Sequence, residues 1–288
     1  MEPSWTIRSK DDTRIAGYEL GGTGEVILIA HATGLCGPMY RSLAEELAPR
    51  FRMVAFDFRG HGDSGSAEDY SWGRTAEDII AVAEFLSVGP VHAFGHSMGG
   101  ASLLLAERSA PSTFASLFLF EPIVFSSATR SDEQNVMADS ARRRRVEFDS
   151  RADALYRFAN KPPFDQIQVS GLAAYVEHGF AQDPHGRVRL KCLPEVEASL
   201  FEQGRVSRLE DVEGTTTPTV IAVGREDGDF GPARLGPPLA NALPNGVLVR
   251  YGHMGHFGPL QDPWTIARDL GNHIATLDAP ERNRMGAR

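Results

Sequence analysis

The sequence predicts an α/β fold, in which a mostly parallel, doubly wound sheet of eight strands is interrupted by a helical insertion. Its 288 residues suit one large domain that carries an insertion. Short apolar runs alternate with segments of helical spacing, and one long interval has helical spacing alone. Strands that alternate with helices are joined by right-handed crossovers, which produce a parallel sheet.

Two kinds of strand are predicted. Residues 6–9 and 14–20 alternate polar with apolar side chains on either side of Lys10-Asp11-Asp12, which predicts an antiparallel hairpin. Six nearly continuous apolar runs follow, as is typical of parallel strands buried on both faces. They are Val26–Ala30, Met53–Phe56, Val91–Phe94, Leu117–Phe120, Val220–Val223 and Val247–Val249.

Helices are predicted between these runs, at residues 40–47, 75–87, 99–109, 239–243 and 264–277. In the second, Ile79, Val82, Ala83 and Leu86 recur at helical spacing, and Gly89-Pro90 stops the pattern. Residues 75–78, Thr-Ala-Glu-Asp, resemble a capping box at its start.

The interval from Pro122 to Val212 breaks the alternation of strands and helices. It contains helical spacing, as at residues 152–158 and 172–180, and it is rich in Phe, Tyr and Met. We therefore expect a core formed by residues 1–121 and 213–288, with residues 122–212 as a helical cap insertion.

The amino-acid composition of the chain restricts the classes of partner that it is expected to bind. Apolar residues make up 42% of the chain and charged residues 23%, and the apolar runs are too short to cross a bilayer. The N-terminus lacks the basic start and apolar stretch of a secretory signal, so a soluble, cytoplasmic protein is expected. The net charge of −9 argues against nucleic-acid binding. No motif specifies an oligomeric state.

Two further features are interpreted as structural. Arg142 to Arg145 form a run of four, but consecutive residues of a helix point all the way round it, so a solvated helix or local ion pairs are expected rather than an anion site. Cys36 and Cys192 lack the spacing of a metal site or a disulfide framework, which predicts two buried thiols.

Residues 95–100, Gly-His-Ser-Met-Gly-Gly, place a serine where a strand ends and a helix begins. A nucleophile must stand clear of the sheet, and a tight turn from strand to helix achieves this when small residues flank it. The following helix directs its free N–H groups at the reacting centre. Such a turn can also serve only to pack a helix on a strand, so the prediction of a nucleophile at Ser97 depends on its partners.

Two later strand ends carry the partners that a serine nucleophile requires. A serine hydroxyl needs a base at neutral pH, and the base needs a carboxylate to orient it. The run Val220–Val223 leads into Gly-Arg-Glu-Asp-Gly-Asp at residues 224–229, and Val247–Val249 leads into a segment that contains His253 and His256.

At these motifs the chain resembles the α/β-hydrolase fold superfamily, and the resemblance covers nearly its whole length. Residues 95–100 are similar to its nucleophile elbow, residues 224–227 to its acid loop, and Gly-His-Phe at 255–257 to its histidine loop. Asp57 to Ser64 resembles the loop after its fourth strand. His31-Ala32-Thr33-Gly34 resembles its oxyanion-hole loop, which commonly begins His-Gly and here has Ala32 in the second position.

The resemblance implies a catalytic triad of Ser97, Asp227 and His256, with the backbone N–H groups of Thr33 and Met98 receiving the oxyanion. It implies no metal and no organic cofactor. His96 is expected to support the elbow by hydrogen bonding. Alternatives remain at two positions: His253 could be the base, and the acid could be Glu226, Asp229 or Glu121, the last of which ends a strand that supplies the acid in some relatives.

The expected activity is that of a serine hydrolase, most simply a carboxylesterase acting on a small apolar ester. The insertion would then cap the nucleophile, and its aromatic side chains suggest an apolar acyl or alcohol pocket, with Phe125, Phe158, Phe164, Tyr175 and Phe180 as candidates. Carbon–carbon bond hydrolases, lactonases and perhydrolases use the same triad. A ligand receptor built on a hydrolase scaffold is the alternative from another class.

Overall fold

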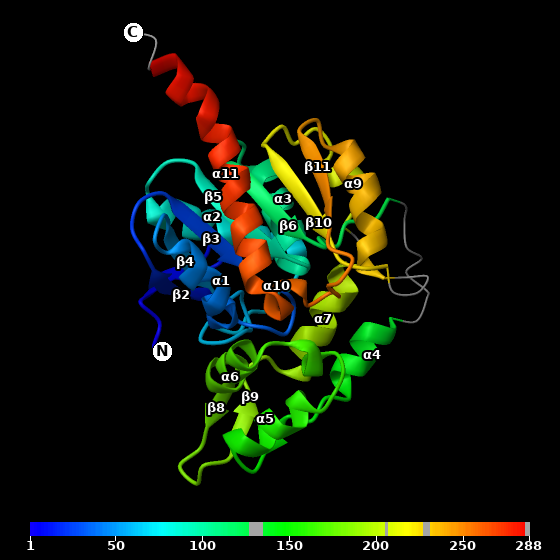
Figure 1. The fold of residues 1–288 in the computed structure, drawn as a ribbon. Coiled ribbons are helices and arrows are strands. Elements are labelled where there is room, and N and C mark those ends of the chain that lie inside the picture. The colour runs from blue at the N-terminus through cyan, green and yellow to red at the C-terminus, as the bar shows by residue number, and fades with distance from the viewer. Residues whose placement is uncertain (127–134, 205–206, 227–230, 286–288) are drawn as a thin grey trace.

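The computed structural model describes residues 1–126, 135–204, 207–226 and 231–285. A central sheet carries helices on both faces, and the segment between β6 and β10 lies at one end of it (Figure 1). This arrangement is the α/β fold that the sequence predicts.

All eight predicted strands of the main sheet are present, in the order β1-β2-β4-β3-β5-β6-β10-β11. The pairs β1–β2 and β2–β4 are antiparallel and the other five pairs are parallel. The strands are β1 (Trp5–Arg8), β2 (Arg14–Gly21), β3 (Val26–Ala30), β4 (Arg52–Phe56), β5 (Val91–His96), β6 (Phe114–Phe120), β10 (Thr219–Val223) and β11 (Gly246–Arg250).

The helices of the core divide between the two faces of the sheet. They are α1 (Arg41–Leu47), α2 (Trp72–Leu86), α3 (Met98–Ser109), α9 (Gly236–Ala242), α10 (Gly258–Gln261) and α11 (Pro263–Met285), with short 3₁₀ helices η1 (Gly37–Tyr40) and η3 (Pro232–Leu235). Side chains of α1 and α11 join one apolar cluster, and those of α2, α3 and α9 join the other. Along β3, Ile27 and Ile29 contribute to the first cluster and Leu28 and Ala30 to the second, as the pleat requires.

Three helices differ by three residues or more from their predicted bounds, and one of them, α9, begins at Gly236 instead of residue 239. Helix α2 begins at Trp72, and the Thr75 hydroxyl lies inside it, where it donates to the Trp72 carbonyl oxygen at 2.9 Å and contacts the Ser102 hydroxyl at 2.7 Å. Thr75 therefore joins α2 to α3 and does not cap a helix, so the predicted capping box is wrong. Helix α11 continues to Met285, past the predicted end at Leu277.

The segment between β6 and β10 contains strands as well as helices. Its helices are α4 (Val136–Arg142), α5 (Arg151–Ala159), η2 (Phe164–Gln166), α6 (Val169–His178), α7 (Pro194–Gly204) and α8 (Leu209–Val212). Strands β7 (Glu147–Phe148), β8 (Phe180–Gln182) and β9 (Val188–Leu190) form an antiparallel sheet in the order β7-β9-β8. The expectation of helices alone is corrected here. Strands of two or three residues are too short to show an alternating pattern.

Several hydrogen bonds attach this segment to the core. Lys191, just after β9, donates to Asp63 Oδ1 at 2.6 Å. The Trp72 indole N–H of α2 donates to the carbonyl oxygen of Leu200 in α7 at 3.1 Å. The segment between β6 and β10 is therefore anchored to the core at separate points.

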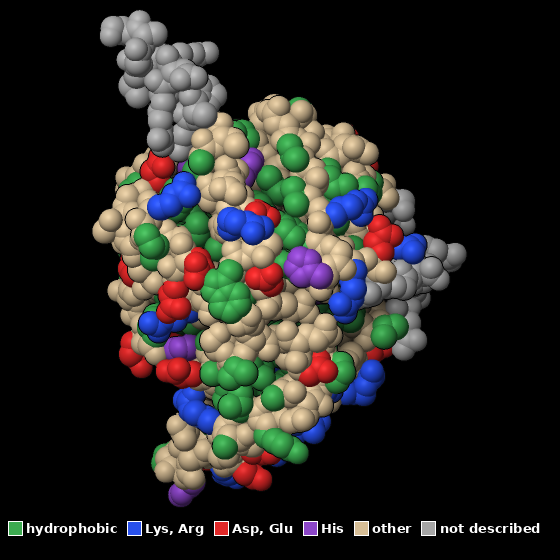
Figure 2. All heavy atoms as spheres, viewed as in Figure 1, with side chains coloured by type: hydrophobic (Ala, Val, Ile, Leu, Met, Phe, Trp, Pro, Cys, Tyr) green, Lys and Arg blue, Asp and Glu red, His purple; other side chains and the backbone are tan. Residues whose placement is uncertain are grey.

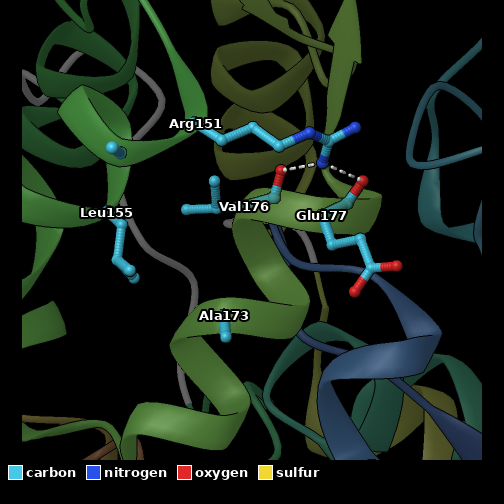
Figure 3. A pocket seen from close by; sticks show the side chains of 6 residues that line it. Arg151, Leu155, Ala173, Val176 and Glu177 are labelled. Carbon is cyan, nitrogen blue, oxygen red and sulfur yellow. Dashed lines mark hydrogen bonds between the residues drawn. The ribbon is translucent and has the colours of Figure 1, made fainter.

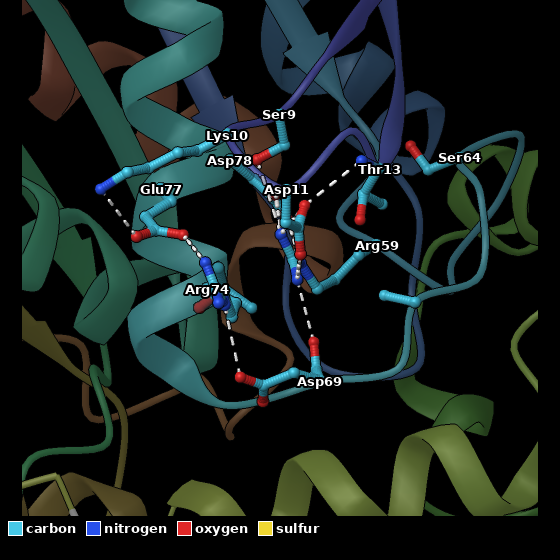
Figure 4. A network of polar contacts seen from close by, with 12 residues as sticks. Ser9, Lys10, Asp11, Thr13, Arg59, Ser64, Asp69, Arg74, Glu77 and Asp78 are labelled. Atoms are coloured by element: carbon cyan, nitrogen blue, oxygen red, sulfur yellow. Dashed lines mark hydrogen bonds and ion pairs between the residues drawn. The ribbon is translucent and has the colours of Figure 1, made fainter.

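A buried network around Arg59 fixes the loop that follows β4 (Figure 4). The Arg59 side chain is fully buried and donates to both carboxylate oxygens of Asp78 in α2, at 2.8 and 2.7 Å. It also donates to Asp11 in the β1–β2 turn and to the carbonyl oxygen of Asp69. One guanidinium thus joins the hairpin, the loop and α2.

Charged side chains of both signs lie on the surface of the described residues. Figure 2 shows acidic and basic side chains interspersed on one face, with no continuous basic patch there. In the part of the chain that the structure describes, no helix is long and apolar enough to cross a membrane. The same residues contain no group of three His, Cys, Asp or Glu side chains placed to hold a metal ion. Cys36 and Cys192 are buried free thiols, as predicted.

Candidate active site

Ser97 lies at the sharp turn between β5 and α3. Its backbone has φ 55° and ψ −116°, a strained conformation for a residue with a side chain. A Cβ on Gly95 would lie 2.6 Å from Gly100 Cα, and one on Gly99 would lie 2.2 Å from the Ala30 carbonyl oxygen. The two glycines therefore provide space for the turn, while the strain is held by the serine itself.

His256 contacts both Ser97 and a carboxylate. Its Nε2 lies 3.1 Å from Ser97 Oγ, and its Nδ1 lies 2.5 Å from Glu121 Oε2. A carboxylate only accepts, so Nδ1 carries the proton and Nε2 is the acceptor for the serine hydroxyl. His253 is 64% exposed, and its Nε2 lies 3.6 Å from Asp262 Oδ2. Of the two candidate bases, His256 is the one that contacts the serine.

Glu121 follows β6 directly, and its side chain is almost completely buried. Its φ of 46° is rare for a residue other than glycine. The second carboxylate oxygen accepts the Gly224 N–H at 2.8 Å, and a Cβ on Gly224 would lie 3.1 Å from that oxygen. The missing side chain of Gly224 therefore leaves room for the Glu121 carboxylate.

Of the other candidate acids, the structure describes Glu226 alone. The predicted acid Asp227 lies outside the described residues, as does Asp229. Glu226 is exposed and forms an ion pair with Arg250 at 3.3 Å. The carboxylate in contact with the histidine is thus the alternative that ends β6.

The loop after β3 presents one N–H group between two that are already bonded. The Ala32 N–H donates to Tyr40 Oη at 3.3 Å, and the Gly34 N–H donates to His61 Nε2 at 3.0 Å. Within the described residues, the Thr33 N–H between them has no acceptor, and neither has the Met98 N–H at the start of α3. Ala32, which stands where glycine is usual, is buried in the core and fits the loop.

Two buried histidines hold this loop as neutral acceptors. His31 Nε2 accepts the Phe58 N–H at 3.0 Å, just as His61 Nε2 accepts the Gly34 N–H. Burial lowers the pKa of His31 to about 4 and that of His61 to about 3. Neither imidazole therefore changes its charge near neutral pH, and both have a structural role.

Tyr40 and His96 connect the loop to the histidine. Tyr40 Oη accepts the Ala32 N–H, so its own proton is donated to His96 Nδ1 at 2.7 Å. His96 Nε2 then donates to the His256 carbonyl oxygen at 2.8 Å. Burial holds the pKa of His96 well below its usual value, which keeps the imidazole neutral. The His96 side chain, which was expected to support the elbow, thus joins Tyr40 to the backbone of His256.

A cavity of about 450 Å³ lies over Ser97 and His256, between the core and the insertion. Of the five predicted aromatic residues, Phe158 and Phe164 line it. Tyr175 is buried and stacks on Phe164 with ring centroids 5.4 Å apart. Phe180 packs against Phe148 inside the insertion, and Phe125 pairs with Arg208 as an isolated bridge. Phe125, Tyr175 and Phe180 are thus not part of the lining, because they form the internal packing of the insertion and its border.

Polar residues also line the cavity, and the sequence analysis did not identify them. They are Arg144, Lys161, Gln166, Glu197, Arg225 and Gln261. Gln261 accepts the Gly255 N–H at 2.8 Å and donates to Gln166 at 2.9 Å, which connects the histidine loop to the insertion. No pattern distinguishes Arg144 from the other arginines of its run, so the sequence offers no signal for its position.

Comparison with known proteins agrees with this geometry. Residues 26–276 match the family model described as the alpha/beta hydrolase family. The chain belongs to the alpha/beta hydrolase family. It is 25% identical over 268 residues to a Mycobacterium tuberculosis protein named for a non-heme bromoperoxidase, BpoC, covering 91% of this chain and 98% of that protein.

Solved structures resemble the whole chain. One is E-2-(acetamidomethylene)succinate hydrolase, with a TM-score of 0.79 and 19% identity, covering 94% of this chain and 99% of the other. Another is a thermophilic esterase from Thermogutta terrifontis, with a TM-score of 0.70 and 20% identity, covering 95% and 98%. At this identity the likeness shows the fold of this alpha/beta hydrolase.

This alpha/beta hydrolase has a second cavity, of about 420 Å³, between α5 and α6 (Figure 3). Arg151 crosses it and donates to the carbonyl oxygens of Val176 and Glu177 at 3.0 and 2.9 Å. The rest of its lining is Ala152, Leu155 and Ala173, which includes no nucleophile. It is an open depression that Arg151 stabilises by joining the two helices, and it offers no catalytic group.

Proposed function

We propose that this alpha/beta hydrolase hydrolyses carboxylic esters through an acyl-enzyme formed on Ser97. The proposal depends on one observation: Ser97 Oγ, His256 and Glu121 form a continuous chain of contacts of 3.1 and 2.5 Å beneath a cavity large enough for a small ester. A serine with a base and an orienting carboxylate is the arrangement that acyl transfer requires.

In the first step Ser97 Oγ attacks the ester carbon while His256 Nε2 accepts its proton. The imidazolium that forms keeps its Nδ1 proton, directed at the buried Glu121 carboxylate, whose negative charge stabilises it. The alcohol leaves with the proton from Nε2. Water, activated by the same nitrogen, then attacks the acyl-enzyme and releases the acid.

Negative charge on the carbonyl oxygen would be stabilised by the N–H groups of Thr33 and Met98. Both are without an acceptor in the described part of the chain, and Met98 begins a helix of 12 residues whose N-terminal dipole adds to the effect. Because the neighbouring N–H groups of Ala32 and Gly34 are engaged, Thr33 is the donor that this loop leaves for the substrate.

We propose Glu121 as the acid in place of Asp227, which lies outside the described residues. This assignment is supported by the contact with His256 Nδ1, by burial, and by the positive φ that directs the side chain from the end of β6. Strain of this kind persists where the surrounding structure stabilises it, and it is common at active sites.

The test is hydrolysis of p-nitrophenyl esters of increasing acyl length by the wild-type protein and by Ser97→Ala under multiple-turnover conditions. We expect steady turnover by the wild type and a loss of about 10³-fold or more in the variant. An equal rate in Ser97→Ala would exclude the serine as nucleophile. A single turnover that leaves the ligand bound would instead indicate a receptor.

A further inference from the structure

We propose that the ester substrate carries a carboxylate group, which Arg144 binds inside the active-site cavity. This inference depends on the proposed function, and it replaces the expected apolar substrate by an anionic one. Its basis is the position of Arg144, the hydrogen bonds that hold it, and the charges around it.

The run of four arginines separates into different environments. Arg142 forms ion pairs with Glu195 and Glu202 at 3.1 and 2.8 Å on the surface, and Arg145 forms one with Asp153 at 3.1 Å. Arg143 is exposed. Arg144 lines the cavity over Ser97, and its side chain is only 15% exposed.

Two hydrogen bonds hold the Arg144 guanidinium in place, and they use only part of its N–H groups. One Nη1 proton is donated to Glu197, and one Nη2 proton is donated to Tyr175 Oη at 2.6 Å. A guanidinium has five N–H groups, so three remain without an acceptor among the residues described. Glu197 and Tyr175 therefore fix the orientation of the guanidinium, which reduces the entropy lost when it binds an anion.

The guanidinium lies close to the predicted oxyanion loop. A Cβ on Gly34, which follows Thr33 directly, would lie 2.6 Å from Glu197 Oε1 and 3.2 Å from Arg144 Nη1, so the ion pair as a whole borders this loop. The face of Arg144 is further packed by aromatic rings, with its Cζ 6.0 Å from the centroids of Phe158 and Phe164. A substrate whose carbonyl oxygen is at Thr33 would thus extend past Arg144.

Among the described residues that line the cavity, cationic side chains outnumber anionic ones, although the chain has a net charge of −9. Arg144, Lys161 and Arg225 line it, whereas Glu197 is the one lining carboxylate among the described residues. Arg225 donates to Gln166 at 3.3 Å, which directs it along the cavity wall. Apolar walls around charges of one sign concentrate the field and attract a counter-ion.

Burial acts to lower the pKa of Arg144, but Tyr175 and Glu197 outweigh it and raise the pKa above its usual value, so the guanidinium stays charged. A planar carboxylate accepts two parallel N–H groups from a guanidinium. Glu197 would repel a dianion more than a monoanion, which favours a carboxylate over a phosphate.

The first experiment compares esters that differ only in charge. Monoethyl succinate, glutarate and adipate are each paired with the ester in which a carboxamide of the same shape replaces the carboxylate, and ethanol release is measured. We expect kcat/KM for the acid to exceed that for the amide by about tenfold or more at one chain length, and the ratio to fall as NaCl is added. A ratio of one or less at every length would overturn the proposal.

The second experiment identifies the cation. Arg144→Gln together with Glu197→Gln removes both charges of the pair, so no buried charge is left alone. We expect the acid-to-amide ratio to fall about fivefold or more in this double variant and to stay unchanged in Arg143→Gln, the exposed neighbour. An unchanged ratio in a double variant that melts like the wild type would overturn the role of Arg144.

If the double variant does not fold, Lys161→Gln with Arg225→Gln takes its place, and an unchanged ratio there counts against the cationic cavity. Turnover of both esters without preference would overturn this inference and leave the proposed function intact. If neither ester is hydrolysed, the proposed function fails. In that case the inference is tested by calorimetric measurement of the binding of monoethyl glutarate and of its carboxamide analogue to Ser97→Ala. Tighter binding of the ester that carries the carboxylate supports the inference, and equal binding overturns it.

Discussion

Glu121 Oε2 lies 2.5 Å from His256 Nδ1, so the carboxylate in contact with the histidine is supplied by the end of β6. The other oxygen of Glu121 accepts the Gly224 N–H, which begins the loop after β10. The sequence predicted the acid in the loop that begins at Gly224. In the structure the backbone of that loop binds the carboxylate of Glu121, which follows the neighbouring strand β6.

Glu121→Gln is expected to lower kcat for ester hydrolysis by about 10³- to 10⁴-fold, because an amide neither stabilises the imidazolium nor fixes its tautomer. Asp227→Asn is the matched control and should keep kcat within about threefold of the wild type. Steady-state kinetics of both variants on the same p-nitrophenyl ester compares the two acids directly. A larger loss in Asp227→Asn than in Glu121→Gln would return the assignment to Asp227.

Tyr40→Phe should lower kcat by about 10- to 100-fold, since small displacements of catalytic groups cost this much. The variant removes the hydroxyl that joins the Ala32 N–H to His96, and His96 in turn holds the His256 carbonyl. We expect KM to change far less than kcat. Tyr70→Phe, which loses only a hydrogen bond from the Ala67 N–H, is the control. Equal kcat values for the two variants would show that the chain through Tyr40 does not position the site.

Arg59→Met should destabilise the fold by about 3–5 kcal/mol, because it leaves the Asp78 carboxylate buried without a counter-charge. Arg74→Met removes an exposed arginine that pairs with Asp69 and Glu77, and it should change stability little. Urea unfolding of both variants measures the difference. Similar midpoints for the two would contradict the role given to the Arg59 network.

Asp11 should make stability depend on pH in the acid range. Burial alone would raise its pKa, but hydrogen bonds from Arg59 and Thr13 outweigh it and lower the pKa from 3.8 to about 2. A folded pKa below the unfolded value stabilises the protein above about pH 4, and this contribution is lost as the pH falls toward 2. It amounts to at most about 2 kcal/mol.

The measurement for Asp11 is the free energy of unfolding of the wild type and of Asp11→Asn between about pH 2 and 6. The variant should be the less stable protein above about pH 4, and the difference should close at the acid end. A difference that is constant with pH would mean that the Asp11 carboxylate does not titrate with a lowered pKa.

Much of the fold is predictable because most of the parallel strands are short, nearly continuous apolar runs. The eight strands of the main sheet follow from composition, whereas β7, β8 and β9 have two or three residues each and give no period. The pattern also places Ser97 and His256, since each follows a parallel strand at the same edge of the sheet, although β11, before His256, is partly exposed.

The acid and the cavity were harder to predict for physical reasons. Spacing favoured Asp227, which lies outside the described residues, whereas Glu121, which contacts His256, has a backbone angle, φ 46°, that a sequence does not display. Arg144 resembles Arg142, Arg143 and Arg145 in every local respect, and it points into the cavity only because of how the insertion packs. Tertiary packing, and not local pattern, decides both cases.

The pairing of β6 with β10 has a consequence for how this family can diverge. The two strands lie side by side and parallel, with Phe120 opposite Ala222, so they end at the same edge of the sheet, where Glu121 contacts both His256 and the Gly224 N–H. During evolution a carboxylate could be exchanged between these neighbouring strand ends while the serine and the histidine stayed where they are. Once the acid comes from β6, selection on the loop after β10 no longer has to preserve a catalytic side chain, and that loop becomes available for new specificity.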